Sequence, residues 1–289
     1  MIGLIGGTGL GDTLFGEAHA EEHKLYTPFG RPSSPVRVVR WHGLDIAVLA
    51  RHGLGHAYNP SQVPYRANIY ALKQLGCTHV IASGAVGSLR ESIHPRQLVL
   101  PDQVIDKTWR RASTFFDDGL AVHVEFAHPY CESLRRTLHA LAPRVNTVVH
   151  PKATYVCMEG PAFSTIAESN MHREWGGDLI GMTTMPEAKL AREAEMCYAL
   201  IALPTDYDCW RPHEPGVSRQ KLLEEIVGHL KAATENAVTL MKAAIEHFAA
   251  HPPGPCECHE ALSLAIWSDG SAVSRVADKY GVLLKKYVS

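Results

Sequence analysis

The chain opens on MIGLIGGTG, residues 1–9, where a short apolar run meets a glycine-rich turn. An apolar run of this length followed at once by glycines predicts a buried β-strand that ends in a tight loop. Because glycine adopts positive φ without strain, backbone N–H groups in such a loop can converge on an anion, and the Thr8 hydroxyl can bind one of its oxygens. By itself the motif fits a simple turn equally well.

A dinucleotide-binding loop explains this stretch less well. Such a loop follows the pattern G-x-G-x-x-G and opens a helix. Residues 6–11 read GGTGLG instead, and residues 12–19 show no apolar helical face. The glycine spacing therefore favours a phosphate-sized anion, or no ligand at all, over a dinucleotide.

Beyond the first strand, short apolar runs alternate with helical patterns. They predict strands at 36–40, 45–50, 79–82, 155–158, 178–183 and 198–203, and helices at 64–75, 131–141, 167–174 and 187–195. A long helix is predicted from the N-cap Ser218 to Phe248, and the proline-rich residues 252–255 end it. The alternation predicts an α/β fold with a central mixed β-sheet flanked by helices.

We expect one domain over residues 1–289. The hydrophobic content of 46% is ample for a single core, and neither an internal repeat nor a long linker divides the chain. After the proline-rich stop, residues 253–289 still carry an apolar pattern. We therefore expect this segment to be a C-terminal appendage docked on the main domain.

The charge balance argues against nucleic-acid binding. A formal net charge of -2 at pH 7 provides no basic excess to neutralise a phosphate backbone. The apolar runs are all shorter than the roughly 18 residues of a membrane span, and the first residues lack the basic region of a secretion signal. We expect a cytoplasmic protein, without a membrane partner, that binds small molecules or other proteins.

The seven cysteines are an odd number scattered over a long chain, which is unlike a disulfide framework. Cys256 and Cys258 form a C-x-C pair that suggests redox or metal chemistry. Zinc needs about four ligands, however, and the adjacent sequence adds only His251 and His259. We expect the pair to be inert or stabilising and the protein to hold no metal.

Two further strand ends carry residues that suit an anion. Arg51 and His52 directly follow the strand at 45–50, where a guanidinium could clamp a phosphate through two hydrogen bonds. Gly84 and Ala85 follow the strand at 79–82 and are small enough to let an anion approach the backbone. If these strand ends converge with the first loop, they form a phosphate site, although each alone also fits a surface turn.

Asp206 and Asp208 follow the strand at 198–203, and alternation along an extended backbone would point both carboxylates the same way. Such a pair suits a purine that bears a 6-amino group. One acid, protonated, can donate to N7 as the glycosidic bond breaks, while the other accepts from the amino group. A solvated acidic loop remains the main alternative, since two acids without nearby His partners are too few ligands for a metal site.

Six ordered motifs together resemble the methylthioadenosine phosphorylases of the trimeric purine nucleoside phosphorylase family. They are IGGTG (5–9), TPFG (27–30), ARHG (50–53), EGP (159–161), MTTMPEA (182–188) and TDYDCW (205–210). The resemblance spans nearly the whole chain and implies a homotrimer. It also implies phosphorolysis of S-methyl-5'-thioadenosine to adenine and 5-methylthioribose 1-phosphate, in purine and methionine salvage, with inorganic phosphate as co-substrate and no cofactor.

The same resemblance assigns the site residues. It implies phosphate contacts from Thr8, Arg51, His52, Gly84, Ala85 and Thr183, and nucleoside contacts from Phe163, Ser164, Met182, His123, Leu222 and Leu283. Asp206 and Asp208 take the catalytic positions at N7 and the 6-amino group. Many relatives carry Thr at the position of Gly84, so a hydroxyl is missing there. Relatives that prefer 6-oxopurines carry Asn at the position of Asp206, which favours adenine here.

The 5' end of the substrate decides between methylthioadenosine and adenosine. Leu222 suits an apolar pocket for a thioether, and His123 matches a position that the neighbouring subunit contributes in the family. Arg219 falls where the family tends to be apolar. A substrate with a more polar group at the 5' position therefore stays an alternative.

Three alternatives also stay open. The chain could be a phosphorylase of 6-oxopurine nucleosides or methylthioinosine, a hydrolase, or a catalytically silent nucleotide-binding protein.

Overall fold

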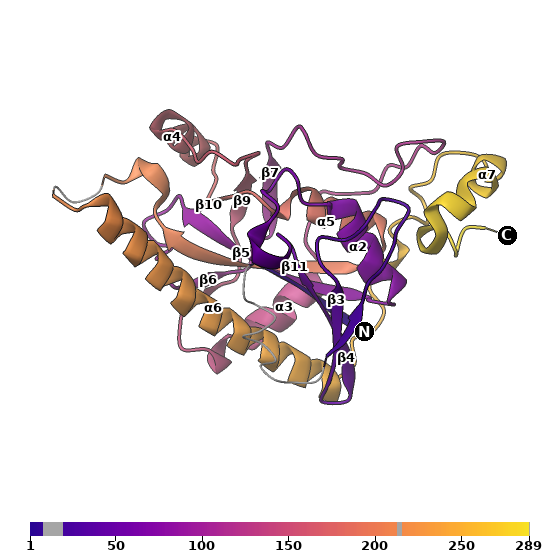
Figure 1. Cartoon of the computed structure of the whole chain (residues 1–289), viewed down its shortest axis with the longest axis horizontal. Coiled ribbons are helices and arrows are strands. Elements are labelled where there is room, and N and C mark those ends of the chain that lie inside the picture. The colour runs from indigo at the N-terminus through magenta and orange to yellow at the C-terminus, as the bar shows by residue number, and fades with distance from the viewer. Residues whose placement is uncertain (8–19, 213–215, 289) are drawn as a thin grey trace.

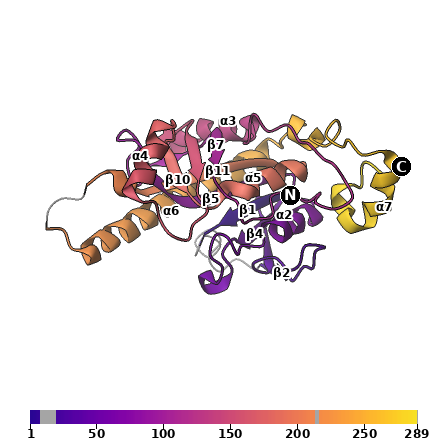
Figure 2. The same cartoon turned by 90° about the horizontal axis from the view of Figure 1, so that it is seen from above.

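The computed structural model of the protein describes residues 1–7, 20–212 and 216–288. The predicted phosphate contact of Thr8 lies outside these residues. Within them, a mixed β-sheet lies at the centre and helices cover both of its faces (Figure 1, Figure 2). The predicted α/β fold with a central mixed sheet is confirmed.

In the described part of the chain the sheet has 11 strands. They are β1 (Ile2–Gly6), β2 (Glu21–His23), β3 (Val36–Trp41), β4 (Leu44–Ala50), β5 (His79–Ser88), β6 (Leu98–Val99), β7 (Gln103–Asp106), β8 (Val149–His150), β9 (Thr154–Cys157), β10 (Leu179–Gly181) and β11 (Cys197–Asp206). The main path runs β2-β3-β4-β1-β5-β10-β9-β7, and β11 pairs with β5 and β6. The strands β4, β1, β5 and β11 are parallel, so their carboxyl ends meet at one edge.

Alternate residues of β11 pack on opposite faces of the sheet, as an extended backbone requires. One face buries Cys197, Ala199, Ile201 and Leu203, and the other buries Tyr198, Leu200 and Ala202. Because both faces are covered, the strand has to be apolar at every position. This explains why a continuous apolar run, rather than an alternating one, marks the central strand.

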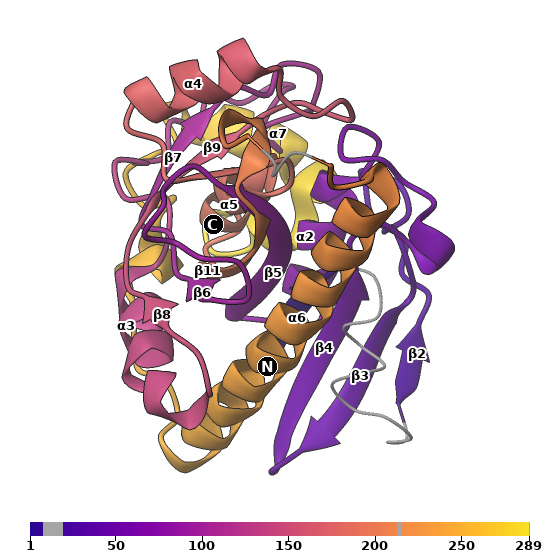
Figure 3. The same ribbon diagram turned by 90° about the vertical axis from the view of Figure 1, so that its left-hand side faces the viewer.

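The helices divide between the two faces. They are α2 (Tyr65–Gln74), α3 (Glu132–Ala140), α4 (Ile166–Glu174), α5 (Thr184–Glu193), α6 (Arg219–Ala250) and α7 (Gly270–Tyr280). α2 and α5 share one hydrophobic cluster with the C-terminal segment, whereas α3 and α6 share the cluster on the other face. Figure 3 shows α6 crossing its face of the sheet obliquely, with α4 at the top of the view beyond β7 and β9.

Local sequence signals explain where two of these helices begin. The Ser218 side chain accepts a hydrogen bond from the backbone N–H of Lys221, which confirms the predicted N-cap of α6. α4 begins with a capping box in which Thr165 and Glu168 bond to each other's backbone N–H groups. Both pairs satisfy donors that the first helical turn leaves free.

Two central strands are longer than predicted. β5 continues to Ser88 and β11 to Asp206, because the two strands pair in parallel from His79 opposite Cys197 to Gly87 opposite Asp206. Gly84 and Ala85 therefore lie inside a strand instead of after one. The pairing of neighbouring backbones outweighs the low strand preference of glycine, which is a tertiary effect that a local pattern cannot reveal.

The C-terminal segment packs mainly onto the face that carries α2 and α5, whereas Cys256 and Cys258 at its start belong to the cluster of α3 and α6. It contains the short helices η4 (Glu257–Glu260) and η5 (Gly281–Leu283) on either side of α7. Leu262, Tyr280 and Leu284 have no exposed surface and belong to the same core cluster as the sheet. The segment thus shares a core with the rest of the chain.

In the described residues, none of the helices has the length and apolar character that crossing a membrane demands.

Candidate active site

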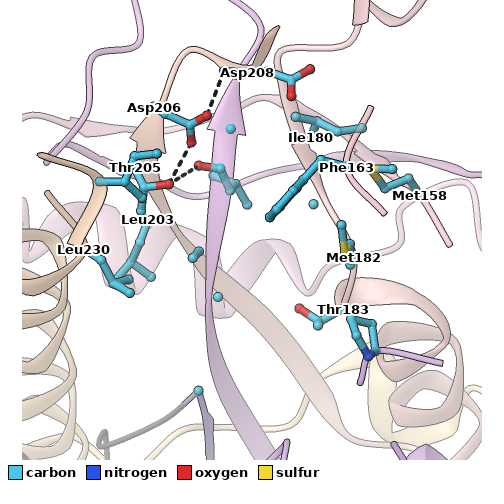
Figure 4. A pocket seen from close by; sticks show the side chains of 18 of the residues that line it. Met158, Phe163, Ile180, Met182, Thr183, Leu203, Thr205, Asp206, Asp208 and Leu230 are labelled. Atoms are coloured by element: carbon cyan, nitrogen blue, oxygen red, sulfur yellow. Dashed lines mark hydrogen bonds between the residues drawn. The ribbon is translucent and has the colours of Figure 1, made fainter. Parts of the chain in front are cut away.

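A cavity of about 600 Å³ opens at the carboxyl edge of the sheet (Figure 4). It lies where β1, β4, β10 and β11 end and where β5 passes between them, the usual place for a ligand in an open α/β sheet. The predicted residues that line it are Arg51, His52, Gly84, Ala85, Phe163, Ser164, Met182, Thr183, Asp206, Asp208 and Leu222. Tertiary folding thus gathers 11 of the predicted residues around one cavity.

Arg51 enters the cavity wall directly after β4 and is held by Glu187 of α5. Its Nε and Nη2 atoms each donate a 2.8 Å hydrogen bond to the Glu187 carboxylate, and Nη1 donates to the Ser83 carbonyl at 2.7 Å. The side chains of this ion pair are 1% and 0% exposed. Burial by itself would lower the pKa of Arg51, but the adjacent carboxylate outweighs it and raises that pKa, so the cation is permanent.

Arg51 has a partner that the sequence did not predict, because the Nε and Nη2 side of its guanidinium meets Glu187. A guanidinium has five N–H donors, and the three bonds above leave two others, on Nη1 and Nη2, for an anion. Glu187, which motif analysis did not assign a role, orients the cation.

His52 lies beside Arg51 and is neutral near pH 7. Burial, together with the nearby Arg51 and His56, lowers the pKa of His52 to about 4. Its Nδ1 lies 2.8 Å from the Tyr58 carbonyl, so Nδ1 carries the proton and Nε2 is an acceptor. A neutral His52 can therefore accept a hydrogen bond from a protonated phosphate oxygen.

Gly84 and Thr183 approach each other at the same end of the cavity. A Cβ atom built on Gly84 would lie 3.2 Å from the Thr183 Oγ1 atom and 3.9 Å from the Arg51 Nη1 atom. Among the described residues, β1 pairs with β5 only as far as Ala82, and β10 pairs with it from Gly87. The β5 backbone between them faces the cavity, where its N–H groups can bind an anion.

Asp206 is the last residue of β11 and lies at the opposite end of the cavity from Thr183 (Figure 4). Its Oδ1 atom accepts a 2.8 Å hydrogen bond from the Thr205 hydroxyl, and its Oδ2 atom accepts one from the backbone N–H of Asp208. The carboxylate is thus fixed by its own neighbours in sequence.

Asp208 does not follow the predicted alternation. The chain leaves the extended conformation at Tyr207, and Asp208 begins a short 3₁₀ turn with a φ of 51°. Its carboxylate turns away from that of Asp206 (Figure 4) and accepts a hydrogen bond from the Ser169 hydroxyl of α4. Both acids line the cavity, but they point in different directions because the strand ends between them.

Apolar side chains form the walls between the two polar ends. Figure 4 shows Phe163, Met158 and Ile180 on one side and Leu203 and Leu230 on the other. The Phe163 side chain belongs to a residue that is 84% exposed, so its ring is open to a flat ligand. An aromatic ring with methionine nearby is a suitable surface for a purine.

The first turns of α6 close the cavity along one side. Leu222, Ile226, Leu230 and Thr234 recur every fourth residue, so they share one face of the helix and all line the cavity. The same spacing in the sequence could have identified Ile226 and Leu230, which motif comparison missed. Arg219 is exposed and is not among the lining residues.

Two predicted nucleoside contacts lie elsewhere in the chain. His123 is exposed, and its ring packs against Trp267 of the C-terminal segment. Leu283 is 3% exposed and packs in the core with Leu284, so its assignment to the substrate is not supported by its position.

Most of the chain matches a known protein family. Residues 1–246 match the model of the phosphorylase superfamily. The chain is 45% identical to the S-methyl-5'-thioadenosine phosphorylase of Thermosynechococcus vestitus, and the match covers 99% of both proteins. It is 43% identical to the S-methyl-5'-thioadenosine phosphorylase of Geobacter sulfurreducens, and that match covers 100% of this chain and 99% of the relative.

Solved structures give the same picture. A methylthioadenosine phosphorylase from an antarctic soil metagenomic library superposes with a TM-score of 0.87 at 43% identity, covering 98% of both chains. The methylthioadenosine phosphorylase from Schistosoma mansoni in complex with adenine superposes with a TM-score of 0.77 at 34% identity, covering 91% of this chain and 96% of that one.

Proposed function

The chain belongs to the phosphorylase superfamily, and from that premise we propose that it cleaves S-methyl-5'-thioadenosine with inorganic phosphate. The products are adenine and 5-methylthioribose 1-phosphate. One observation carries the proposal: a single cavity has Thr183 at one end and Asp206 at the other, with apolar walls between them. Arg51 lies with Thr183, since both are close to Gly84. This is the order in which phosphate, sugar and purine have to lie for phosphorolysis.

The reaction that suits this arrangement passes through a cationic sugar. As the bond from C1' to N9 lengthens, positive charge develops on the ribose and negative charge on the departing purine. Phosphate held by Arg51, Thr183 and the β5 backbone attacks C1' from the opposite face, and its own charge stabilises the cation. At the other end, Asp206 in its protonated form donates to N7 and offsets the charge on adenine.

The walls favour a thioether at the 5' position. Leu222, Ile226 and Leu230 offer a methylthio group an apolar surface, and they leave a hydroxyl without a partner. Arg219 is exposed and outside the cavity lining, so it does not supply the polar group that adenosine would need. Methylthioadenosine is therefore the better substrate on this geometry.

We also propose a homotrimer in which His123 reaches the cavity of a neighbouring subunit. His123 is exposed and is not among the residues that line its own cavity, and its backbone N–H donates to the Ala265 carbonyl of the C-terminal segment. Large apolar side chains such as Trp109, at 78% exposed, also favour burial against another copy. Sedimentation equilibrium tests the assembly, and a monomer with full activity would contradict it.

Phosphate is a co-substrate in this proposal, and no cofactor takes part. The salvage role and a cytoplasmic location follow from the reaction and from the expected reduced state of the cysteines.

The decisive experiment measures adenine release from methylthioadenosine with and without phosphate, with adenosine and inosine in parallel. We expect release only with phosphate, and methylthioadenosine as the best of the three substrates. Release without phosphate would identify a hydrolase, and a preference for inosine would identify a 6-oxopurine phosphorylase. Tight substrate binding without turnover would identify a silent binding protein.

A further inference from the structure

Four cysteines from three distant parts of the chain meet on the α3 and α6 side of the sheet, away from the cavity. The Sγ atoms of Cys131, Cys197, Cys256 and Cys258 all lie within 4.8 Å of one another. Cys131 is the N-cap of α3, Cys197 begins β11, and the C-x-C pair lies at the start of η4. The fold thus supplies the two ligands that the C-x-C pair lacked in the sequence.

The spacing of these sulfur atoms fits a tetrahedral metal site. Zinc binds thiolates at about 2.3 Å, so two sulfurs on the edge of a zinc tetrahedron are about 3.8 Å apart. The Sγ atoms of Cys131 and Cys256 are 3.7 Å apart. All six distances between the four Sγ atoms are at most 4.8 Å, as a single tetrahedral site requires. Two separate thiol pairs would need only the distance within each pair to be short.

The surroundings of the cluster suit bound thiolates. Cys131, Cys197 and Cys258 are buried and Cys256 is partly exposed, which leaves a route for a metal ion. The backbone N–H of Leu134 donates to the Cys131 sulfur, and the Nε2 atom of His259 lies 3.5 Å from the Cys197 sulfur. N–H donors to metal-bound sulfur are the outer contacts that orient thiolate ligands and spread their charge.

We propose that Cys131, Cys197, Cys256 and Cys258 bind one zinc ion that joins the C-terminal segment to the sheet. Zinc prefers four soft sulfur donors in a closed tetrahedral site of this kind. Binding displaces the thiol protons to solvent and needs neither an oxidant nor a reductant. A second group, His79, Cys197 and His259, shares Cys197 but offers only three donors, so the four-sulfur set is the complete one.

The metal has a structural role. None of the four cysteines is among the residues that line the cavity, so the ion is remote from the chemistry. The segment that follows Cys258 contributes Leu262, Tyr280 and Leu284 to the core and holds the backbone of His123. A zinc ion at its start stabilises this docked segment.

The test compares wild type, the double variant Cys256→Ser/Cys258→Ser and the control Cys77→Ala, all purified with a reductant and without chelators. Cys77 is also buried but lies outside the cluster. Mass spectrometry of the metals should find about one zinc per chain in wild type and control, and below about a tenth of that in the double variant. The double variant should also melt at a lower temperature.

Cobalt exchange provides a second measurement on the unaltered protein, should the double variant fail to fold. Replacing zinc with Co²⁺ should produce intense sulfur-to-cobalt charge-transfer absorption and the visible bands of a tetrahedral ion. Wild-type protein that holds no zinc, or whose four thiols are paired in disulfides, would overturn the proposal. Zinc retained in the double variant would overturn it as well, because the ligands would then lie elsewhere.

Discussion

Glu187 orients Arg51 through two hydrogen bonds. Changes at Glu187 should therefore affect the end of the cavity where phosphate is proposed to bind. The carboxylate has no exposed surface, and the Tyr198 hydroxyl donates a further 2.7 Å hydrogen bond to it. A buried charge is tolerated when it is paired and fully hydrogen-bonded. In the proposed function, Glu187 is thus a positioning residue that acts on phosphate through Arg51.

The first prediction concerns Glu187→Gln. The variant keeps the shape of the side chain but leaves the Arg51 cation buried without a counter-charge, which costs about 3–5 kcal/mol of folding free energy. Arg51 also loses its fixed direction, so the KM for phosphate should rise about tenfold, with a smaller change in the KM for the nucleoside. Steady-state kinetics and thermal unfolding measure both. The exposed Glu174→Gln is the control, and an unchanged phosphate KM in Glu187→Gln would show that Glu187 does not act through Arg51.

The second prediction concerns Asp206→Asn. An amide cannot supply an acidic proton to N7, and it can donate to a 6-carbonyl. The ratio of kcat/KM for methylthioadenosine over inosine should fall about 100-fold. Asp278→Asn, at an exposed position on α7, should leave this ratio unchanged. A ratio that is the same in Asp206→Asn and wild type would remove Asp206 from its role.

At the scale of elements, α6 has two functions along its length. From Ala233 to Phe248 its buried face packs against the sheet, whereas its first turns line the cavity. Leu223, which directly follows Leu222, is 62% exposed and is not among the residues that line the cavity. The apolar residues near its N-terminus therefore line the cavity instead of packing in the core.

The third prediction follows from this division. Leu230→Gln puts a polar amide into the 5' wall, so methylthioadenosine should lose about tenfold in kcat/KM relative to adenosine. Val227→Thr is the matched control, because Val227 lies on the same helix at 57% exposure and outside the cavity lining. Equal effects on both substrates would mean that this part of α6 does not contact the 5' group.

At the scale of the whole molecule, Glu193 at the end of α5 holds the long segment between β7 and α3, residues 107–131. Its carboxylate accepts hydrogen bonds from the Thr114 hydroxyl and from the backbone N–H of Phe115, both at 2.7 Å. Burial raises the pKa of Glu193 from 4.5 to about 7, and these two hydrogen bonds only partly oppose the shift. Stability should therefore depend on pH in the neutral range.

The fourth prediction gives the sign of that dependence. Because the folded pKa is raised, the contribution of Glu193 is fully present below pH 4.5 and is lost as pH rises through about 7, a change of about 3 kcal/mol. Glu193→Gln should match wild type near pH 5 and be more stable near pH 8, since the Thr114 hydroxyl can accept from the new amide. Urea unfolding at both pH values measures the difference. A constant difference between variant and wild type would contradict the raised pKa.

Much of the site was predictable because its residues follow strands. Arg51 comes directly after β4 and Asp206 ends β11, and the ends of parallel strands have to meet at one edge. Glu187 and Leu230 were harder to identify, because each lies on a helix whose position over the cavity depends on how that helix packs. The different directions of Asp206 and Asp208 were also missed, since the strand ends between them.

The sequence by itself determined the α/β class, the strand-end motifs and the family, because apolar periodicity and short motifs are local properties of the chain. The tertiary structure alone decided which groups act together. The pairing of Arg51 with Glu187 joins residues 136 positions apart in sequence, and the four cysteines come from three separate segments. Long-range packing sets such distances, and local sequence patterns carry little information about it.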